Sequence, residues 1–90
     1  MTVTRTVEIC NRRGLHARAS NAFARMAQEF ESEIMVEREV ISADARSIME
    51  LLSLAASKGC TIDISATGVD EEAALNALSD FVANRFGEED

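Results

Sequence analysis

The sequence predicts an α+β fold, in which helices cover one face of a mostly antiparallel sheet. Two observations indicate this fold. Strand-like and helix-like segments follow one another in the order β-α-β-β-α-β-α along the 90 residues. Each helix-like segment has one apolar side and each strand-like segment has apolar residues at alternate positions, so every element has a face to bury. A chain of this length forms one core, and we expect a single domain over residues 1–90.

The first third of the chain contains a predicted strand, a turn and a helix. The strand is expected from Val3 to Ile9, where apolar and polar residues alternate. A turn at Asn11 to Gly14 leads into a helix from His16 to Phe30, in which apolar residues recur every three or four positions. These apolar residues are Ala19, Ala22, Phe23, Met26, Ala27 and Phe30.

A predicted hairpin and a second helix follow. Glu33 to Glu37 and Val40 to Ala43 are expected to be two strands joined by a charged turn. The stretch from Ser47 to Glu50 fits a capping box, in which a serine hydroxyl and a glutamate carboxylate each accept a hydrogen bond from a free backbone amide. The helix should therefore start at Ser47 and end near Gly59. The residues that it is expected to bury are Leu51, Leu54 and Ala55.

The last third contains a fourth strand and a third helix. The strand is predicted from Thr61 to Thr67, with Gly68 at its end. Asp70 is expected to cap the helix that follows, because Glu71 and Glu72 occupy its first turn, where the helix dipole favours anions. The apolar stripe of this helix is formed by Leu75, Leu78, Val82 and Phe86, and its end by Arg85 and Gly87.

Composition excludes several classes of function. The formal net charge of −7 argues against nucleic acid as a partner, because binding to a phosphate backbone depends on clustered Lys and Arg. The apolar runs are too short for membrane insertion, and no secretory signal is recognisable, so a cytoplasmic protein is expected. Cys10 and Cys60 are isolated from each other and accompanied by one histidine, so we expect two buried free thiols, with no metal site and no cofactor.

The single histidine, His16, lies just after a glycine-containing turn and at the start of a predicted helix. Free backbone amides and the positive end of the dipole favour a neutral, nucleophilic imidazole there, and the same amides can receive an anion. Arg18 supplies a guanidinium suited to phosphate oxygens, and Gly14 allows close approach of the backbone. A structural histidine on the surface or in the core remains an equal alternative on these residues alone.

Several further residues around His16 bear on these two interpretations. Arg12, Arg13 and Arg18 form a local positive patch in an acidic chain, which suggests a specific anion or an acidic partner. Leu15 is expected to anchor the turn in the core. The motif contains no second acid or base, so it cannot form a hydrolase triad.

One motif in the chain is Gly14-Leu15-His16-Ala17-Arg18, and a second runs from Ser42 to Met49 before the second helix; the stretch from Gly68 to Ala74 accompanies them. Together they resemble the HPr family, the histidine-containing phosphocarriers of the bacterial phosphotransferase system. The resemblance extends over nearly the whole chain. It implies an open-faced β-sandwich, in which three helices cover one face of a four-stranded antiparallel sheet with strand order 1-4-2-3.

The resemblance also implies roles for the residues of the first motif. His16 would accept a phosphoryl group on Nδ1 from enzyme I, which obtains it from phosphoenolpyruvate, and would pass it to an EIIA-type protein. Arg18 would stabilise the phosphoryl group. The family usually has proline after this arginine, whereas this chain has Ala19 and contains no proline. Alanine restores a free amide and loosens the helix start, while the chemistry should survive.

The second helix carries two further expectations. Ser47 is explained as a helix cap, and the resemblance places it at the serine that HPr kinase/phosphorylase phosphorylates in some HPr proteins. Ile48, Met49 and Leu52 make the helix apolar on nearly all sides, so part of this surface should be exposed, Met49 above all. With Ala17, these residues are expected to dock enzyme I and the EIIA-type protein, as the resemblance implies.

The sequence thus predicts a monomeric phosphocarrier with a covalent phosphohistidine, which is not an enzyme in the usual sense. The alternative is an HPr-like regulatory module, whose phosphorylation state controls partner proteins without sugar transport, as in the nitrogen-type branch. The acidic chain and Ala19 favour this branch slightly. A third class, a small enzyme with His16 as general base, lacks a second catalytic group.

Overall fold

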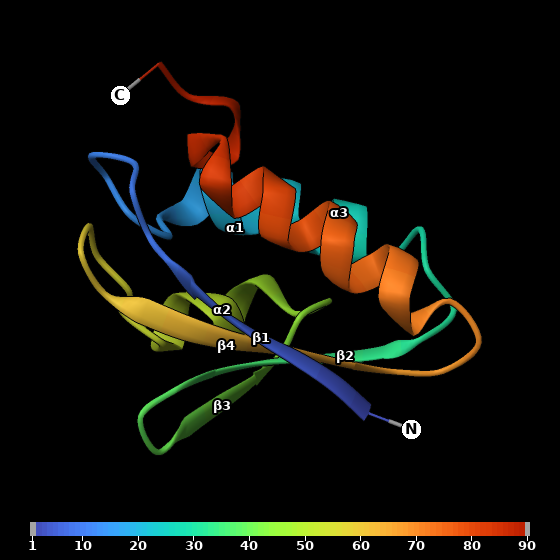
Figure 1. Cartoon of the computed structure of the whole chain (residues 1–90). Helices are drawn as coiled ribbons and strands as arrows, with labels where there is room; N and C mark the ends of the chain where they lie inside the picture. Colours follow the sequence, from blue (N-terminus) through green and yellow to red (C-terminus); the bar gives the residue numbers. More distant parts are fainter. Residues whose placement is uncertain (1, 90) are drawn as a thin grey trace.

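The computed structural model describes residues 2–89 and contains a four-stranded antiparallel sheet with the strand order β1-β4-β2-β3 (Figure 1). The strands are β1 (Thr2–Glu8), β2 (Glu33–Arg38), β3 (Ile41–Asp44) and β4 (Thr61–Thr67). In the central pairs, β4 lies antiparallel to both β1 and β2, with Ile64 opposite Arg5 on one side and Val36 on the other. The predicted fold class and strand order are confirmed.

Three helices lie on one face of this sheet (Figure 1). They are α1 (Ala17–Ala27), α2 (Ile48–Ser53) and α3 (Glu71–Ala83), and a 3₁₀ turn, η1 (Arg85–Gly87), follows α3. Helix α3 packs against β1 and β4, and α1 packs between α2 and α3. Helix α1 thus contacts both other helices, and its N-terminus lies at one edge of the helical layer (Figure 1).

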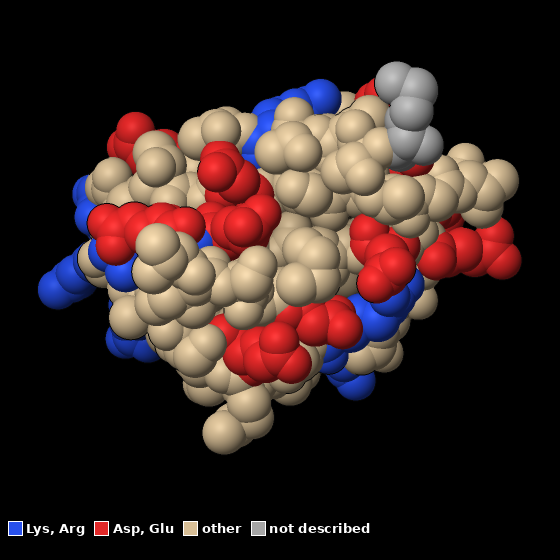
Figure 2. Space-filling model, turned by 90° about the horizontal axis from the view of Figure 1, so that it is seen from below, with Lys and Arg blue, Asp and Glu red and all other residues tan. Residues whose placement is uncertain are grey.

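The core lies between the helices and the inner face of the sheet. Ile34, Ile62 and Ile64 fill it from the strands, and Phe23 and Leu78 from the helices, each exposed by 1% or less. The opposite face of the sheet carries hydroxyl and acidic side chains, and Thr2, Thr4 and Thr6 of β1 form side-chain hydrogen bonds with β4. Figure 2 shows this face from below, with its acidic groups separated by uncharged residues. No helix among residues 2–89 is long and apolar enough to cross a bilayer.

Both of the first two helices end earlier than the sequence predicts. Helix α1 ends at Ala27 rather than Phe30, because Glu29 and Phe30 form tighter turn bonds to Met26 and Ala27. Helix α2 ends at Ser53 rather than near Gly59. Ala55 adopts a left-handed backbone with φ 50°, which stops the helix, and its side chain is exposed rather than buried as predicted.

The capping predictions are right in position and partly wrong in partners. Ser47 caps α2, since its hydroxyl accepts from the Glu50 amide at 3.2 Å. The Glu50 carboxylate, however, accepts from the Asp44 amide at 3.0 Å instead of returning to Ser47, because the Ser47 amide already donates to the Asp44 carbonyl. Asp70 precedes α3 but its carboxylate accepts from the amides of Glu31 and Ser32. It therefore links two loops instead of capping its own helix.

Three further corrections concern turns and thiols. Strand β3 begins at Ile41, because Glu39 (φ 56°) and the exposed Val40 form the hairpin turn. Phe86 is buried as predicted, but it belongs to η1 rather than to the third helix, which ends at Ala83. Cys10 and Cys60 are half-buried rather than buried, because they lie where β1 and β4 meet loops at the end of the sheet.

Candidate functional site

His16 is the N-cap residue of α1. Its backbone is extended (φ −79°, ψ −178°), and its carbonyl accepts the first helical hydrogen bond from the Ser20 amide at 2.8 Å. The ring nitrogen Nδ1 accepts a hydrogen bond from the Arg18 amide at 3.2 Å. The predicted position of the histidine at a helix start is therefore confirmed, and Nδ1 faces the free amides of the first turn.

The turn before His16 is held against the loop that follows α2. Gly14 has φ 66°, and a Cβ added there would lie 2.5 Å from the carbonyl oxygen of Ala56. The amide of Leu15 donates to the same oxygen at 2.9 Å, and the Leu15 side chain is buried as predicted. Only glycine allows so close a backbone approach at this φ. The early end of α2 supplies the loop that fixes the histidine.

The other ring nitrogen of His16 contacts Glu88, which follows η1. The distance between His16 Nε2 and Glu88 Oε2 is 2.5 Å, and each side chain is 23% exposed. Glu88 Oε1 accepts from Asn11 Nδ2 at 2.8 Å, and the same Asn11 amide donates to the Gly14 carbonyl at 2.9 Å. The buried Asn11 thus joins the turn before the histidine to the carboxylate beside it.

These contacts assign the proton of the neutral imidazole. A backbone amide can only donate, so Nδ1 must hold a lone pair towards Arg18. A carboxylate accepts, so the hydrogen belongs on Nε2, towards Glu88. Nδ1 is therefore the nucleophilic nitrogen of His16, at the place where the helix amides can receive an anion.

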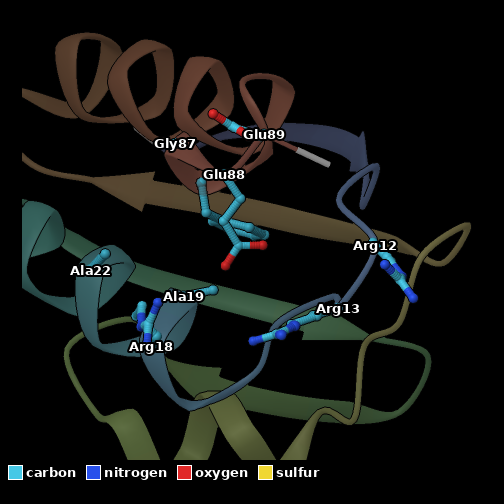
Figure 3. A pocket seen from close by; sticks show the side chains of 9 residues that line it. Arg12, Arg13, Arg18, Ala19, Ala22, Gly87, Glu88 and Glu89 are labelled. Carbon is cyan, nitrogen blue, oxygen red and sulfur yellow. The ribbon is translucent and has the colours of Figure 1, made fainter.

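A pocket beside His16 combines cations with the Glu88 carboxylate (Figure 3). The nine residues that line it are Arg12, Arg13, Arg18, Ala19, Ala22, Phe86, Gly87, Glu88 and Glu89. Figure 3 shows the Glu88 side chain reaching between Arg13 and Arg18, while the carboxylate of Glu89 points away. The hydrogen bond from Asn11 is the largest influence that lowers the pKa of Glu88. The contact with His16 and the charge of Arg13 lower it further. The carboxylate is thus ionised at neutral pH.

The predicted surface residues of α2 lie next to this site, because α2 packs against α1. Met49 is 78% exposed, and Ile48 and Leu52 are each 37% exposed. Leu51, between them, is buried. Ala17 is also exposed, directly after the histidine. The expected exposure is confirmed, and the docking role of these residues stays a prediction. Ser47 is half-buried at the start of α2.

Two residues of the site, Asn11 and Glu88, were not predicted from the sequence. Asn11 was predicted only as part of a turn, and no role was predicted for Glu88. Glu88 is separated from His16 by 72 residues, so their contact depends on the return of the chain after α3. The one available signal was Phe86, an apolar residue predicted to be in contact with the core shortly before the tail.

Comparison with known proteins identifies the kind of protein that this site resembles. The family model described as "PTS HPr component phosphorylation site" matches residues 3–84. The phosphocarrier protein HPr of Neisseria meningitidis is 45% identical over 83 residues, which cover 92% of this chain and 93% of that protein. The phosphocarrier protein NPr of Escherichia coli is 39% identical over 90 residues, covering 99% of this chain and all of that protein. A crystal structure of HPr from Thermoanaerobacter tengcongensis has a TM-score of 0.92 and 44% identity, covering 97% of this chain and 98% of that chain.

Proposed function

Because the chain belongs to the HPr family, the phosphocarriers of the phosphotransferase system, we propose that His16 carries the phosphoryl group. In this proposal enzyme I, phosphorylated from phosphoenolpyruvate, transfers the group to Nδ1 of His16, and an EIIA-type protein removes it. The observation that supports this most directly is the lone pair of Nδ1, which points to the first-turn amide of Arg18. A nucleophile and an anion site therefore coincide in one place.

The local geometry supports the role of Arg18. When Nδ1 bonds to phosphorus, the Arg18 amide loses its acceptor on the ring and can donate to a phosphoryl oxygen instead. Its guanidinium lines the same pocket, together with those of Arg12 and Arg13. A guanidinium and a helix N-terminus both favour phosphate oxygens. Arg18 would thus hold the phosphoryl group through both its backbone and its side chain.

The protein would contribute this nucleophile and anion site, while its partners contribute the rest of the chemistry. Ala17, Ile48, Met49 and Leu52 form the proposed docking patch, since they are exposed around the same end of α1 and α2. Enzyme I and the EIIA-type protein would use this docking patch in turn. Exposed apolar patches of this kind are typical of protein interaction surfaces. We further propose that residues 1–90 act as one monomeric domain in the cytoplasm.

A regulatory role is proposed for Ser47. Its hydroxyl caps α2 and its position adjoins Ile48 and Met49 of the docking patch. A phosphate added there by HPr kinase/phosphorylase would bring negative charge to the start of a helix, where backbone amides can donate to its oxygens without destabilising the fold. The added charge would therefore act on docking. If purified HPr kinase/phosphorylase with ATP does not label the protein, this role of Ser47 is wrong.

The nitrogen-type branch is the second candidate, because the relatives include proteins named HPr and NPr at comparable identities. In this alternative, phosphorylation of His16 controls partner proteins and does not feed sugar transport. The two branches differ in the acceptor. Phosphorylated protein should be offered, in separate reactions, a sugar-type and a nitrogen-type EIIA protein. Faster transfer to the nitrogen-type acceptor favours the regulatory branch, and the opposite order favours transport.

The central test uses enzyme I and radiolabelled phosphoenolpyruvate. The wild-type protein should acquire an acid-labile phosphate, and His16→Ala should acquire none. Label retained in His16→Ala would refute the assignment. Met49→Asp tests the docking patch and should reduce the transfer rate about tenfold, equivalent to about 1.4 kcal/mol of binding free energy. Val69→Asp is its control, because Val69 is similarly exposed (85%) in the loop before α3.

A further inference from the structure

The imidazole of His16 is held at both of its nitrogens by groups from different parts of the chain. The Arg18 amide, from the next turn, donates to Nδ1 at 3.2 Å. The Glu88 carboxylate, from the end of the chain, lies 2.5 Å from Nε2. The first contact is expected for any helix cap, whereas the second requires a specific return of the chain. A carboxylate bonded to the distal nitrogen of a reactive histidine is a recurring arrangement in catalysis.

We propose that Glu88 is a positioning residue for the phosphoryl transfer, a role that rests on the proposed function of His16. Its carboxylate keeps the proton on Nε2 and the lone pair on Nδ1. It also neutralises the positive charge that the ring acquires during the transfer. The three groups that hold Glu88 in place are the Nε2 proton of His16, the Asn11 amide and the anchored Phe86.

The charge on the ring follows from the balance of the reaction. The lone pair of Nδ1 forms the bond to phosphorus, while the bond from phosphorus to the donor breaks and its electron pair leaves with the donor. Nε2 keeps its proton, so the neutral ring becomes a cation that bears the phosphoryl group. The adjacent carboxylate stabilises this cation more than it stabilises the neutral ring, and this difference accelerates the transfer.

The same carboxylate repels the negative phosphoryl group, and the geometry decides which effect is larger. Glu88 contacts Nε2, whereas the phosphoryl group would be bonded to Nδ1, on the side of the Arg18 amide. The positive ring therefore lies between the two anions. Because Coulomb energy falls with distance, the attraction between the carboxylate and the ring exceeds its repulsion of the phosphoryl group. The guanidinium groups in the pocket reduce this repulsion further.

The segment just before Glu88 is anchored in the core, and this allows the Glu88 carboxylate to reach the ring. Phe86 is buried, and its ring makes edge-to-face contacts with Phe23 and Phe81, at centroid distances of 6.4 and 5.6 Å. Its backbone has φ 54°, a conformation that non-glycine residues adopt only where packing compensates the strain. Asn11 then orients the carboxylate through Nδ2. The packing of Phe86 and the hydrogen bond from Asn11 therefore hold the Glu88 carboxylate in a defined position.

The experiment compares Glu88→Ala with Glu72→Ala, which removes the same charge from an exposed residue in the first turn of α3, outside the pocket beside His16. Proton NMR with ¹⁵N-labelled histidine should show a downfield Nε2 proton in the unphosphorylated wild type and in Glu72→Ala. This signal should be lost in Glu88→Ala. Transfer from enzyme I should be about tenfold slower in Glu88→Ala and change less than twofold in Glu72→Ala. Urea unfolding of both variants confirms that they are folded.

A third variant separates charge from hydrogen bonding. Glu88→Gln keeps an oxygen that can accept from Nε2 but removes the charge, so it should retain the downfield proton and still transfer several-fold more slowly. Equal transfer rates in Glu88→Ala and Glu72→Ala, or a downfield proton that persists in Glu88→Ala, would overturn the proposal. A wild-type protein that keeps the proton but accepts no phosphoryl group would instead overturn the function of His16, and the role of Glu88 with it.

Discussion

At Gly14 a single hydrogen atom in place of a side chain determines how closely the turn before His16 approaches the loop after α2. The φ of 66° alone costs an alanine about 1 kcal/mol, and its Cβ would also lie 2.5 Å from the Ala56 carbonyl oxygen. We therefore expect Gly14→Ala to lose at least about 2 kcal/mol of unfolding free energy, measured by urea denaturation. The backbone shift that relieves the clash should also displace His16 and slow phosphoryl transfer.

The control for this prediction is Gly59→Ala. Gly59 also has a positive φ, 93°, but an added Cβ would meet no atom within 4 Å. Its substitution should cost only the backbone strain, about 1 kcal/mol. If both variants lose the same unfolding free energy, the close approach of Gly14 to Ala56 contributes nothing to stability.

The residues of the site divide according to their separation in the sequence. Gly14, His16 and Arg18 could be predicted together, because a turn followed by a helix start places them next to one another whatever the rest of the chain does. Glu88 could not be predicted, because contacts between distant parts of the chain bring it to the histidine: Phe86 packs on Phe23 and Phe81, and Asn11 donates to the Glu88 carboxylate. The proton position on the His16 ring could not be predicted either, because it depends on the contact between Nε2 and Glu88.

At the scale of the elements, helix α1 contains Ala19 at the position where the HPr family usually has proline. Ala19 is the third residue of α1, so its amide lies in the first turn and precedes the helical hydrogen bonds. A proline there removes no helical bond and restricts the unfolded chain. Ala19→Pro should raise the unfolding free energy by about 0.5–1 kcal/mol and slow amide exchange in the first turn.

The matched substitution for Ala19→Pro is Ala22→Pro, one turn further into α1. Its amide donates within the helix, so proline should cost about 3 kcal/mol. Urea denaturation of both variants measures the difference. A loss of stability in Ala19→Pro would mean that the proline ring does not fit beside the core at this position.

The junction between α1, β2 and α3 depends on the carboxylate of Asp70. It accepts from the Ser32 hydroxyl at 2.5 Å and from the Glu31 and Ser32 amides at 2.9 Å. The Ser32 hydroxyl and then the Glu31 amide lower the pKa of Asp70. Its ionised form therefore stabilises the fold at pH values above the unfolded pKa of about 3.9, and this contribution is lost as the pH falls through the lower folded pKa.

We expect Asp70→Ala to be less stable than wild type at about pH 7, and the difference to shrink as the pH falls from the unfolded pKa of about 3.9 through the lower folded pKa. Urea denaturation across this range measures it. Glu72→Ala is the control, because it removes an exposed carboxylate from the first turn of the same helix. A stability difference for Asp70→Ala that does not change with pH would show that its ionisation is not linked to folding.

The positions of helices and strands could be predicted where apolar residues recur with a regular period. Their ends could not be predicted where the adjoining loops make tertiary contacts. Strand β4 spans Thr61–Thr67 as predicted, because alternation on a half-buried strand is a local property. The end of α2 was missed, because Lys58 and Gly59 look like a helix end. Helix α2 ends at Ser53 instead, and the loop after it brings the Ala56 carbonyl to the Leu15 amide in the turn that contains Gly14. A tertiary contact thus overrides the local signal.

At the scale of the whole molecule, His16 lies at the start of α1 and most of the proposed docking patch lies on α2, and these two helices pack on each other. Contact between α1 and α2 brings Met49 and its neighbours to the same part of the surface as His16. A partner that covers α2 can therefore reach the ring without a rearrangement of the fold. Within residues 2–89, acidic side chains other than Glu88 and Glu89 lie outside the pocket, including on the uncovered face of the sheet (Figure 2), so the three arginines beside His16 form a local positive region in a chain of net charge −7.

At Ser47, a substitution can change the docking of a partner without changing the unfolding free energy. Asp is as good a helix cap as Ser, so Ser47→Asp should change the unfolding free energy by less than about 0.5 kcal/mol. The new charge lies beside Ile48 and Met49, and transfer from enzyme I should fall about tenfold, because a charge at an apolar contact must lose its hydration. Ser53→Asp places the same charge at the other end of α2 and should instead lower stability, through the helix dipole. Unchanged transfer in Ser47→Asp would exclude this end of α2 from the docking surface, whatever the effect on the fold.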